Sequence, residues 1–142
     1  MVAKVRRLLL AVDDSDASGR AVPIAREIAQ GVGCEVLVVH VRDREVCCKG
    51  PAWEKPMPCT PGEFVAELVA DFRAAGVNAT GEVHASLNRH EADEILATAD
   101  AFGADLIVAG ANRHWSTLPG ILEKSTGRKI VERSRHPLLL VP

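Results

Sequence analysis

The chain has 142 residues, of which 47% are hydrophobic and 25% are charged, and its formal net charge is −2 at neutral pH. This length suits one domain with a hydrophobic core and is too short for two. The balanced charge gives no support for nucleic acid or an anionic membrane surface as the main partner. The first apolar run ends in two aspartates and is far too short for a signal segment or a membrane span, so we expect a cytoplasmic protein.

Two stretches in the first half predict buried strands. Arg7–Val12 is continuously apolar, which is typical of a central parallel strand that is covered on both faces. Glu35–Val41 is apolar and rich in β-branched residues, and it predicts a second buried strand.

A helix is expected between these two strands. Its apolar residues recur at helical spacing from near Ala17, after possible N-caps at Ser15 and Ser18, and glycines 31 and 33 supply its end. Pro23 removes a hydrogen bond inside the helix, so we expect the helix to bend or loosen around residues 19–23.

The segment 42–60 is rich in charge, proline, glycine and cysteine, and it predicts a long variable loop, such as a lid, a binding loop or a disordered insert. The four cysteines lie at positions 34, 47, 48 and 59, a spacing that fits neither a zinc ribbon nor a disulfide scaffold. We interpret them as reduced thiols, with Cys34 in or near a core strand. The alternative is a redox-sensing loop formed by Cys47, Cys48 and Cys59, which thiol titration after peroxide treatment would test.

The second half continues the alternation of helix and strand. Thr60-Pro61-Gly62-Glu63 is a strong helix start, and Gly76 ends that helix. The later expected elements are a less buried strand at 77–86, a helix from residue 88 or 89 to Gly103, a strand at 105–109, an amphipathic helix from about residue 125, and a last strand within 136–142 whose terminal prolines suit a sheet edge. Five strands and four helices in alternation predict an α/β fold with a five-stranded, parallel, doubly wound sheet.

Ligands of such sheets bind outside the carboxyl ends of the strands. Asp13 follows the first strand, and Gly110 follows the fourth. If these strands are neighbours, the two residues face each other, and a nucleotide could bind with its ribose on Asp13 and its phosphates at the start of the last helix, where free N–H groups and the helix dipole favour anions. The other residues of this predicted anion cradle are Asn112, Arg113, Lys124, Ser125 and Thr126. The alternative is that Asp13 and Asp14 only end a strand and that Lys124 is a solvated cation.

The histidines are scattered singly, so the sequence predicts no metal site; they lie at positions 40, 84, 90, 114 and 136. His40, in an apolar strand, suits a hydrogen-bonded core histidine better than a metal ligand, although it is also near the crevice. Trp115 either packs on the domain, contacts a partner or covers the crevice. No G-x-S-x-G and no G-x-x-x-x-G-K-(S/T) motif is present.

Four motifs together resemble the universal stress protein family: A-V-D-D-S-x-x-S, V-L-V-V-H-V, A-D-L-I-V-A-G and H-P-L-L-L-V-P, in this order. The resemblance covers essentially the whole chain except residues 42–59. It implies a Rossmann-like, adenine nucleotide alpha hydrolase-like sheet of strand order 3-2-1-4-5, with the first and fourth strands as neighbours. It also implies a homodimer paired through the last strand, 138–141, and an adenine contact at Val41.

The ATP-binding members of that family carry G-x-x-G, nine residues, and then G-(S/T). Here Gly110 matches the first glycine, Arg113 stands in place of the second, and Lys124-Ser125 replaces the final pair after one extra residue. Side chains at these positions narrow a phosphate cradle that glycines would keep open, although both are cations that could neutralise phosphate. The segment R-H-W-S-T-L resembles the members that lack the motif and do not bind ATP.

The resemblance therefore implies a non-catalytic, homodimeric stress-response or signalling module with weak or absent ATP binding. Binding of ATP with Mg²⁺ is the alternative. A slow ATPase or another enzyme of nucleotide phosphates is a further alternative, although it lacks an identifiable base or metal set beyond Asp13 and Asp14. A phosphoacceptor receiver domain is rejected, because the expected third strand offers E-V-H-A-S without an aspartate, and the fifth strand is followed by no lysine.

Overall fold

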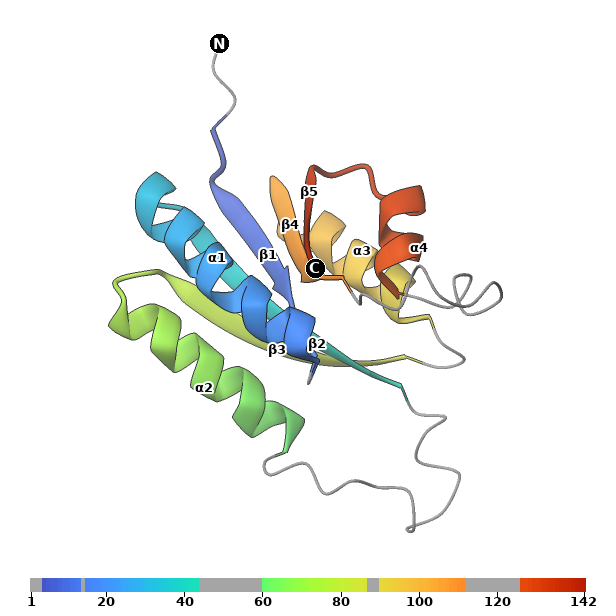
Figure 1. Cartoon of the computed structure of the whole chain (residues 1–142), viewed down its shortest axis with the longest axis horizontal. Helices are drawn as coiled ribbons and strands as arrows, with labels where there is room; N and C mark the ends of the chain where they lie inside the picture. The colour runs from blue at the N-terminus through green and yellow to red at the C-terminus, as the bar shows by residue number, and fades with distance from the viewer. Residues whose placement is uncertain (1–3, 14, 44–59, 87–89, 112–125) are drawn as a thin grey trace.

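The computed structural model describes residues 4–13, 15–43, 60–86, 90–111 and 126–142. Within these residues, five parallel strands form one sheet in the order β3-β2-β1-β4-β5 (Figure 1). The chain alternates strictly between strand and helix: β1 (Arg7–Ala11), α1 (Asp16–Val32), β2 (Glu35–Asp43), α2 (Pro61–Ala74), β3 (Ala79–Ser86), α3 (Glu91–Phe102), β4 (Leu106–Gly110), α4 (Thr126–Arg133) and β5 (Leu138–Val141). This order confirms the predicted doubly wound fold.

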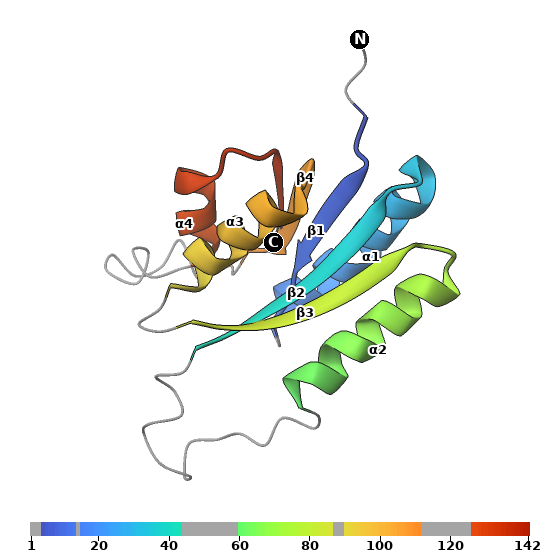
Figure 2. The same ribbon diagram turned by 180° about the vertical axis from the view of Figure 1, so that it is seen from behind.

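Helices cover both faces of the sheet. Helices α1 and α2 lie on one face, and α3 and α4 lie on the other, as the two opposite views show (Figures 1 and 2). Alternate residues of β1 enter opposite cores: Leu8 and Leu10 pack with α1 and α2, whereas Leu9 packs with α3 and α4. All three leucines are fully buried, which explains why this strand is apolar without alternation.

Helix α1 has the expected bounds and is continuous. Ser15 caps its first turn by accepting a hydrogen bond from the N–H of Ser18, at 3.2 Å. The helix runs unbroken past the exposed Pro23, so the loosening expected around residues 19–23 is wrong, while the bend that was the other possibility stays a prediction. Gly33 ends it in the left-handed conformation (φ 75°) and donates its N–H to the carbonyl of Ala29, whereas Gly31 lies inside the last turn.

Helix α2 packs closely on β3, and the contact depends on a glycine. The capping box of α2 is formed as predicted, since Thr60 and Glu63 exchange hydrogen bonds between side chain and backbone. A Cβ at Gly81 would overlap the Val65 side chain of α2 and lie 2.9 Å from Cγ2 of Val69. The glycine in β3 therefore allows α2 to approach the sheet.

Strand β4 begins one residue later than predicted, because Asp105 has a different role. The Oδ2 atom of Asp105 accepts hydrogen bonds from the N–H groups of Arg6 and Arg7, at 2.9 and 3.1 Å. These two donors hold the pKa of the Asp105 carboxyl below its ordinary value. The side chain thus fastens the beginning of β4 to the beginning of β1.

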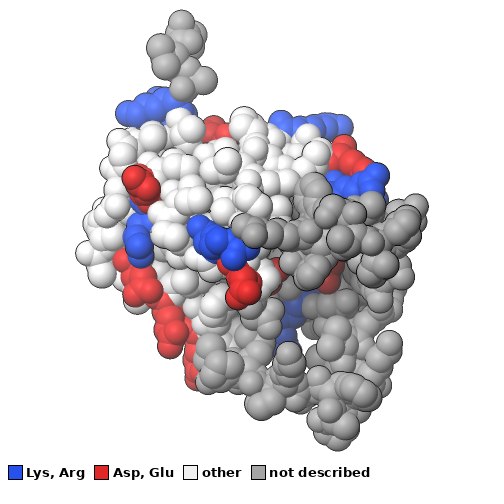
Figure 3. Space-filling model, in the orientation of Figure 1, with Lys and Arg blue, Asp and Glu red and all other residues white. Residues whose placement is uncertain are grey.

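Acidic and basic side chains are interspersed over the visible face of the described residues (Figure 3). This distribution agrees with the small net charge of the sequence. Among the helices that the structure describes, none is long and apolar enough to cross a membrane.

Candidate functional site

The carboxyl ends of β1 and β4 lie side by side. The two strands pair in parallel register from Leu8 with Leu106 to Ala11 with Ala109. Gly110 follows Ala109 directly and Asp13 follows Ala11 after one residue, so both lie at the same edge of the sheet, at the ends of adjacent strands. The adjacency that the sequence argument required is therefore present.

Asp13 takes part in the turn that begins α1. Its Oδ1 atom accepts a hydrogen bond from the N–H of Ser15 at 2.8 Å, and its own N–H donates to Oγ of Ser18 at 2.8 Å. The Asp13 side chain is nevertheless exposed. One carboxylate oxygen thus has a structural partner, and the carboxylate lies beside the positive end of the α1 dipole.

Gly110 is required by packing against α1, a reason that the sequence argument missed. A Cβ at this position would lie 2.6 Å from the backbone carbon of Ala17 and 2.6 Å from the nitrogen of Ser18. The φ angle of Gly110 is outside the left-handed region, so conformational freedom is not the reason for the glycine. The first turn of α1 sits directly on this residue, on the face of the sheet opposite to α3 and α4.

His40 is a hydrogen-bonded histidine, as one of the two sequence interpretations held. Its Nδ1 atom donates to the carbonyl of Val12 at 2.8 Å, because a carbonyl can only accept. The ring also meets Phe64 of α2 edge to face, with 6.0 Å between the ring centroids. His40 thus belongs to the α1/α2 face, whereas the next residue, Val41, is half-buried and packs against the core under α3 and α4.

Thr126 is the first residue of α4, the helix whose start was predicted to bind phosphate. The helix is anchored by Ile130, which is buried in the core, and by Arg133, whose Nη1 atom donates to Oδ1 of Asp93 in α3 at 2.5 Å. This hydrogen bond, followed by one from His90, lowers the pKa of Asp93. The other predicted cradle residues, Asn112, Arg113, Lys124 and Ser125, lie outside the described residues, as do Trp115 and the cysteines at 47, 48 and 59.

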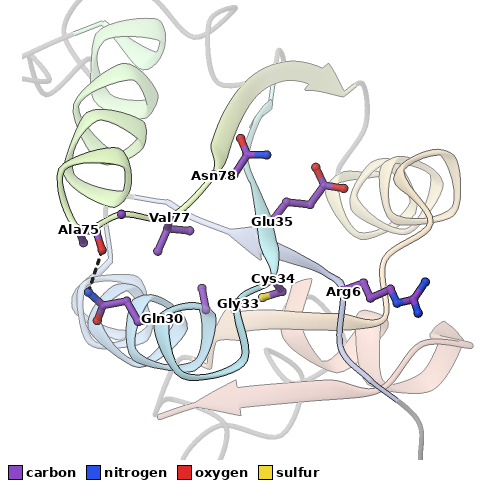
Figure 4. Close-up of a pocket in the computed structure, with 10 residues that line it drawn as sticks. Arg6, Gln30, Gly33, Cys34, Glu35, Ala75, Val77 and Asn78 are labelled. Atoms are coloured by element: carbon purple, nitrogen blue, oxygen red, sulfur yellow. Dashed lines mark hydrogen bonds between the residues drawn. The ribbon is translucent and has the colours of Figure 1, made fainter.

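A cavity of about 620 Å³ lies at the opposite, amino edge of the sheet (Figure 4). It is bounded by the C-terminal ends of α1 and α2 and by the beginnings of β2 and β3, and sequence reasoning did not predict it. Two of its polar side chains have protein partners: Gln30 donates to the carbonyl of Ala75, and Glu35 accepts from Nε of Arg7. Burial raises the pKa of the Cys34 thiol on its wall, which favours the protonated form of that thiol.

No three His, Cys, Asp or Glu side chains are placed to hold a metal ion in the described part of the chain. The described residues of the carboxyl edge present an exposed carboxylate, helix starts and a half-buried apolar surface.

A parallel α/β sheet of order 3-2-1-4-5 with these features at its carboxyl edge defines a class of small Rossmann-like proteins. The chain belongs to the universal stress protein family, whose family model matches residues 4–142. It is 31% identical, over 140 residues, to the universal stress protein in the QAH/OAS sulfhydrylase 3′ region of Thermus aquaticus. The aligned region covers 96% of this chain and 98% of that relative.

Solved structures share the fold at lower identity. A universal stress protein in complex with cAMP superposes with a TM-score of 0.73 at 23% identity, covering 98% of both chains. The universal stress protein from Archaeoglobus fulgidus in complex with dAMP gives a TM-score of 0.68 at 22% identity, covering 99% of this chain and 100% of that one.

Proposed function

We propose that this chain is a non-catalytic stress-response or signalling module that acts as a homodimer and binds ATP weakly or not at all. The observation that carries the proposal is the sequence of the predicted phosphate cradle. Arg113 and Lys124 stand where ATP-binding members of the family have glycines, and side chains there obstruct the close approach of backbone N–H groups to phosphates.

Two observations on described residues support the proposal that a triphosphate binds weakly. The missing side chain of Gly110 makes room for α1 rather than for a ligand, so this glycine alone is no sign of a working phosphate loop. One oxygen of Asp13 is engaged by the N–H of Ser15, which leaves that carboxylate less capacity to hold a ribose or a metal ion.

The direct test measures ligand-induced thermal stabilisation with millimolar ATP and Mg²⁺. We expect no shift. A stabilisation of about 2 kcal/mol or more would require ligand far above its dissociation constant and would overturn the proposal of weak binding. In that case Asp13→Ala and Lys124→Glu should each weaken the binding, and phosphate release that Asp13→Asn abolishes would indicate an ATPase.

The proposed dimer interface is the outer edge of β5, the last strand of the sheet among the described residues, where residues 138–140 are half-exposed leucines. The carbonyl of Pro137 accepts a hydrogen bond from Ile107 of β4, and that of Val141 accepts one from Ala111, the residue after β4. The N–H of Leu140 therefore points away from β4, by the alternation of a parallel ladder. Leu140→Pro should therefore yield monomers in light-scattering measurements, whereas Leu140→Ala, which keeps the N–H, should remain dimeric. A dimeric proline variant would exclude this edge as the interface.

A second candidate function is the binding of an adenine monophosphate nucleotide. It is favoured by the two structural neighbours, which were solved in complex with cAMP and dAMP. A monophosphate makes smaller demands on the narrowed cradle than a triphosphate, because it presents a single phosphoryl group. Calorimetric titration with AMP and cAMP, beside ATP with Mg²⁺, separates the two candidates: heat with the monophosphates alone supports the second.

A further inference from the structure

Ser86 is a buried polar residue without a partner. It is the last residue of β3, at the carboxyl edge of the sheet, and only 5% of it is exposed. Its Oγ atom has no hydrogen-bond partner, and it is the single buried side-chain polar atom of this kind among the described residues. Because such a hydroxyl has lost its water without a replacement, it destabilises the unliganded fold and calls for a physical explanation.

The register of the sheet places this hydroxyl on the face covered by α3. His84, two residues before Ser86, contacts Glu94 of α3 through Nδ1 at 3.2 Å. Side chains two apart in a strand point to the same face, so Ser86 also points toward the side of α3. The pairs Val41 with His84 and Asp43 with Ser86 show that Val41 of β2 shares this face.

Val41 and Ser86 lie on one face of the sheet and offer a ligand two different kinds of contact, one apolar and one polar. They are separated by one strand spacing and two residues along the strand, which puts their Cα atoms roughly 8 Å apart. Val41 offers a half-buried apolar surface, and Ser86 offers a hydroxyl that can donate and accept. A flat heteroaromatic ring is the ligand that fits both, because its face can pack on a valine while its edge makes a hydrogen bond in the plane of the ring.

We propose that Ser86 is a specificity-determining residue whose hydroxyl accepts a hydrogen bond from the 6-amino group of an adenine base packed on Val41. This inference rests on the second candidate function, adenine monophosphate binding, and assigns the group that recognises the base. The hydroxyl is shielded from bulk water in this structure, so the base supplies a partner that solvent does not. Removal of the hydroxyl is then expected to lower the affinity for the adenine nucleotide without lowering the stability of the unliganded protein.

The test is a calorimetric comparison of AMP with purine riboside monophosphate, which lacks the 6-amino group, in the wild type and in Ser86→Ala. We expect the wild type to prefer AMP by roughly three- to tenfold, the range of one neutral hydrogen bond. The alanine variant should bind AMP more weakly by a similar factor and lose the preference, while its unliganded melting temperature is unchanged or higher. Thr80→Ala, which removes an exposed hydroxyl far along the same strand, is the control and should change neither quantity.

Three results would overturn the inference, and they are distinguishable. If the wild type binds AMP and Ser86→Ala keeps both the affinity and the preference, the hydroxyl does not contact the base, although the nucleotide function stands. If the wild type binds neither nucleotide at millimolar concentration, the second candidate function fails and the inference fails with it. A lower melting temperature of unliganded Ser86→Ala would instead assign the hydroxyl a structural role.

Discussion

The amino and carboxyl edges of the sheet differ in the length of the connections between helices and strands. At the amino edge the connections are short, at 33–34, 75–78, 103–105 and 134–137. At the carboxyl edge two stretches between elements are also short, 12–15 and 87–90, whereas the other two are long, 44–60 and 111–125. The long connections of this fold therefore lie at the carboxyl edge of the sheet, and long surface loops are the segments of a fold that can vary most.

Hydrogen bonding follows the same division. At the amino edge, Gly33, Gly76 and Gly103 adopt positive φ and end three helices, and Asp105 joins β1 to β4. At the carboxyl edge, the Asp13 carboxylate is exposed and the Ser86 hydroxyl is unpartnered. These polar groups of the amino edge are thus bonded within the fold, whereas at the carboxyl edge the second oxygen of the Asp13 carboxylate and the Ser86 hydroxyl are left for a ligand. The predictions below test this division, from the largest expected effect to the smallest.

The largest effect should come from Gly110→Ala, at the carboxyl edge. The new Cβ meets the backbone of α1 rather than the end of a flexible side chain, so the first turn of the helix must move. We expect a loss of about 1–3 kcal/mol or more in the free energy of unfolding, measured by urea denaturation. Gly19→Ala, in α1 with open space around it, is the control and should be neutral or stabilising. An unchanged stability of Gly110→Ala would refute the packing explanation.

At the amino edge, Gly33→Ala should cost about 1–2 kcal/mol, because an alanine is strained in the left-handed conformation that this residue adopts. Gly31→Ala, two residues earlier and inside the same helix, should have the opposite sign and stabilise by about 0.5–1 kcal/mol. Thermal unfolding of both variants provides the comparison, and equal signs would contradict it.

Ser15→Ala should destabilise the protein by about 1 kcal/mol, since it removes the acceptor that caps α1. Ser15→Asp keeps a capping oxygen and should recover most of the loss. If chemical denaturation shows no difference between the two variants, the cap is not a source of stability.

The smallest effect should depend on pH. The pKa of Asp105 is lower in the folded protein than its ordinary value of 3.8, because the N–H groups of Arg6 and Arg7 stabilise the carboxylate. Its contribution to stability is therefore present above that value and is lost as the pH falls through the lower folded pKa. Asp105→Asn should have a lower melting temperature than the wild type at neutral pH, and the gap should close under acid. Glu67→Gln, at an exposed position of α2, should show no such trend.

Much of the fold followed from the sequence, for identifiable physical reasons. The unbroken apolar run at 8–10 required cover on both faces, and the Thr60–Glu63 capping box marked the start of α2. The loosening expected at residues 19–23 is wrong because the expectation considered only the hydrogen bond that Pro23 removes. It left out the burial of the alanine face of α1 against the sheet. Tertiary packing outweighed that local cost.

The site was less predictable, because its groups come from segments that are distant in the chain. Sequence motifs identified Asp13 and Gly110 as neighbours, and the pairing of β1 with β4 confirmed this. They gave no hint that Gly110 accommodates α1, since that contact depends on how closely a helix approaches the sheet. They also gave no reason to select Ser86, because one serine resembles another until burial and the absence of a partner distinguish it.

The sequence by itself determined the order of elements, their alternation and the parallel sheet, because periodicity and capping act within a few residues of each other. The tertiary structure alone decided which glycine serves packing, which carboxylate fastens a strand and which hydroxyl is left without a partner. These outcomes depend on distances between segments that only the folded chain brings together.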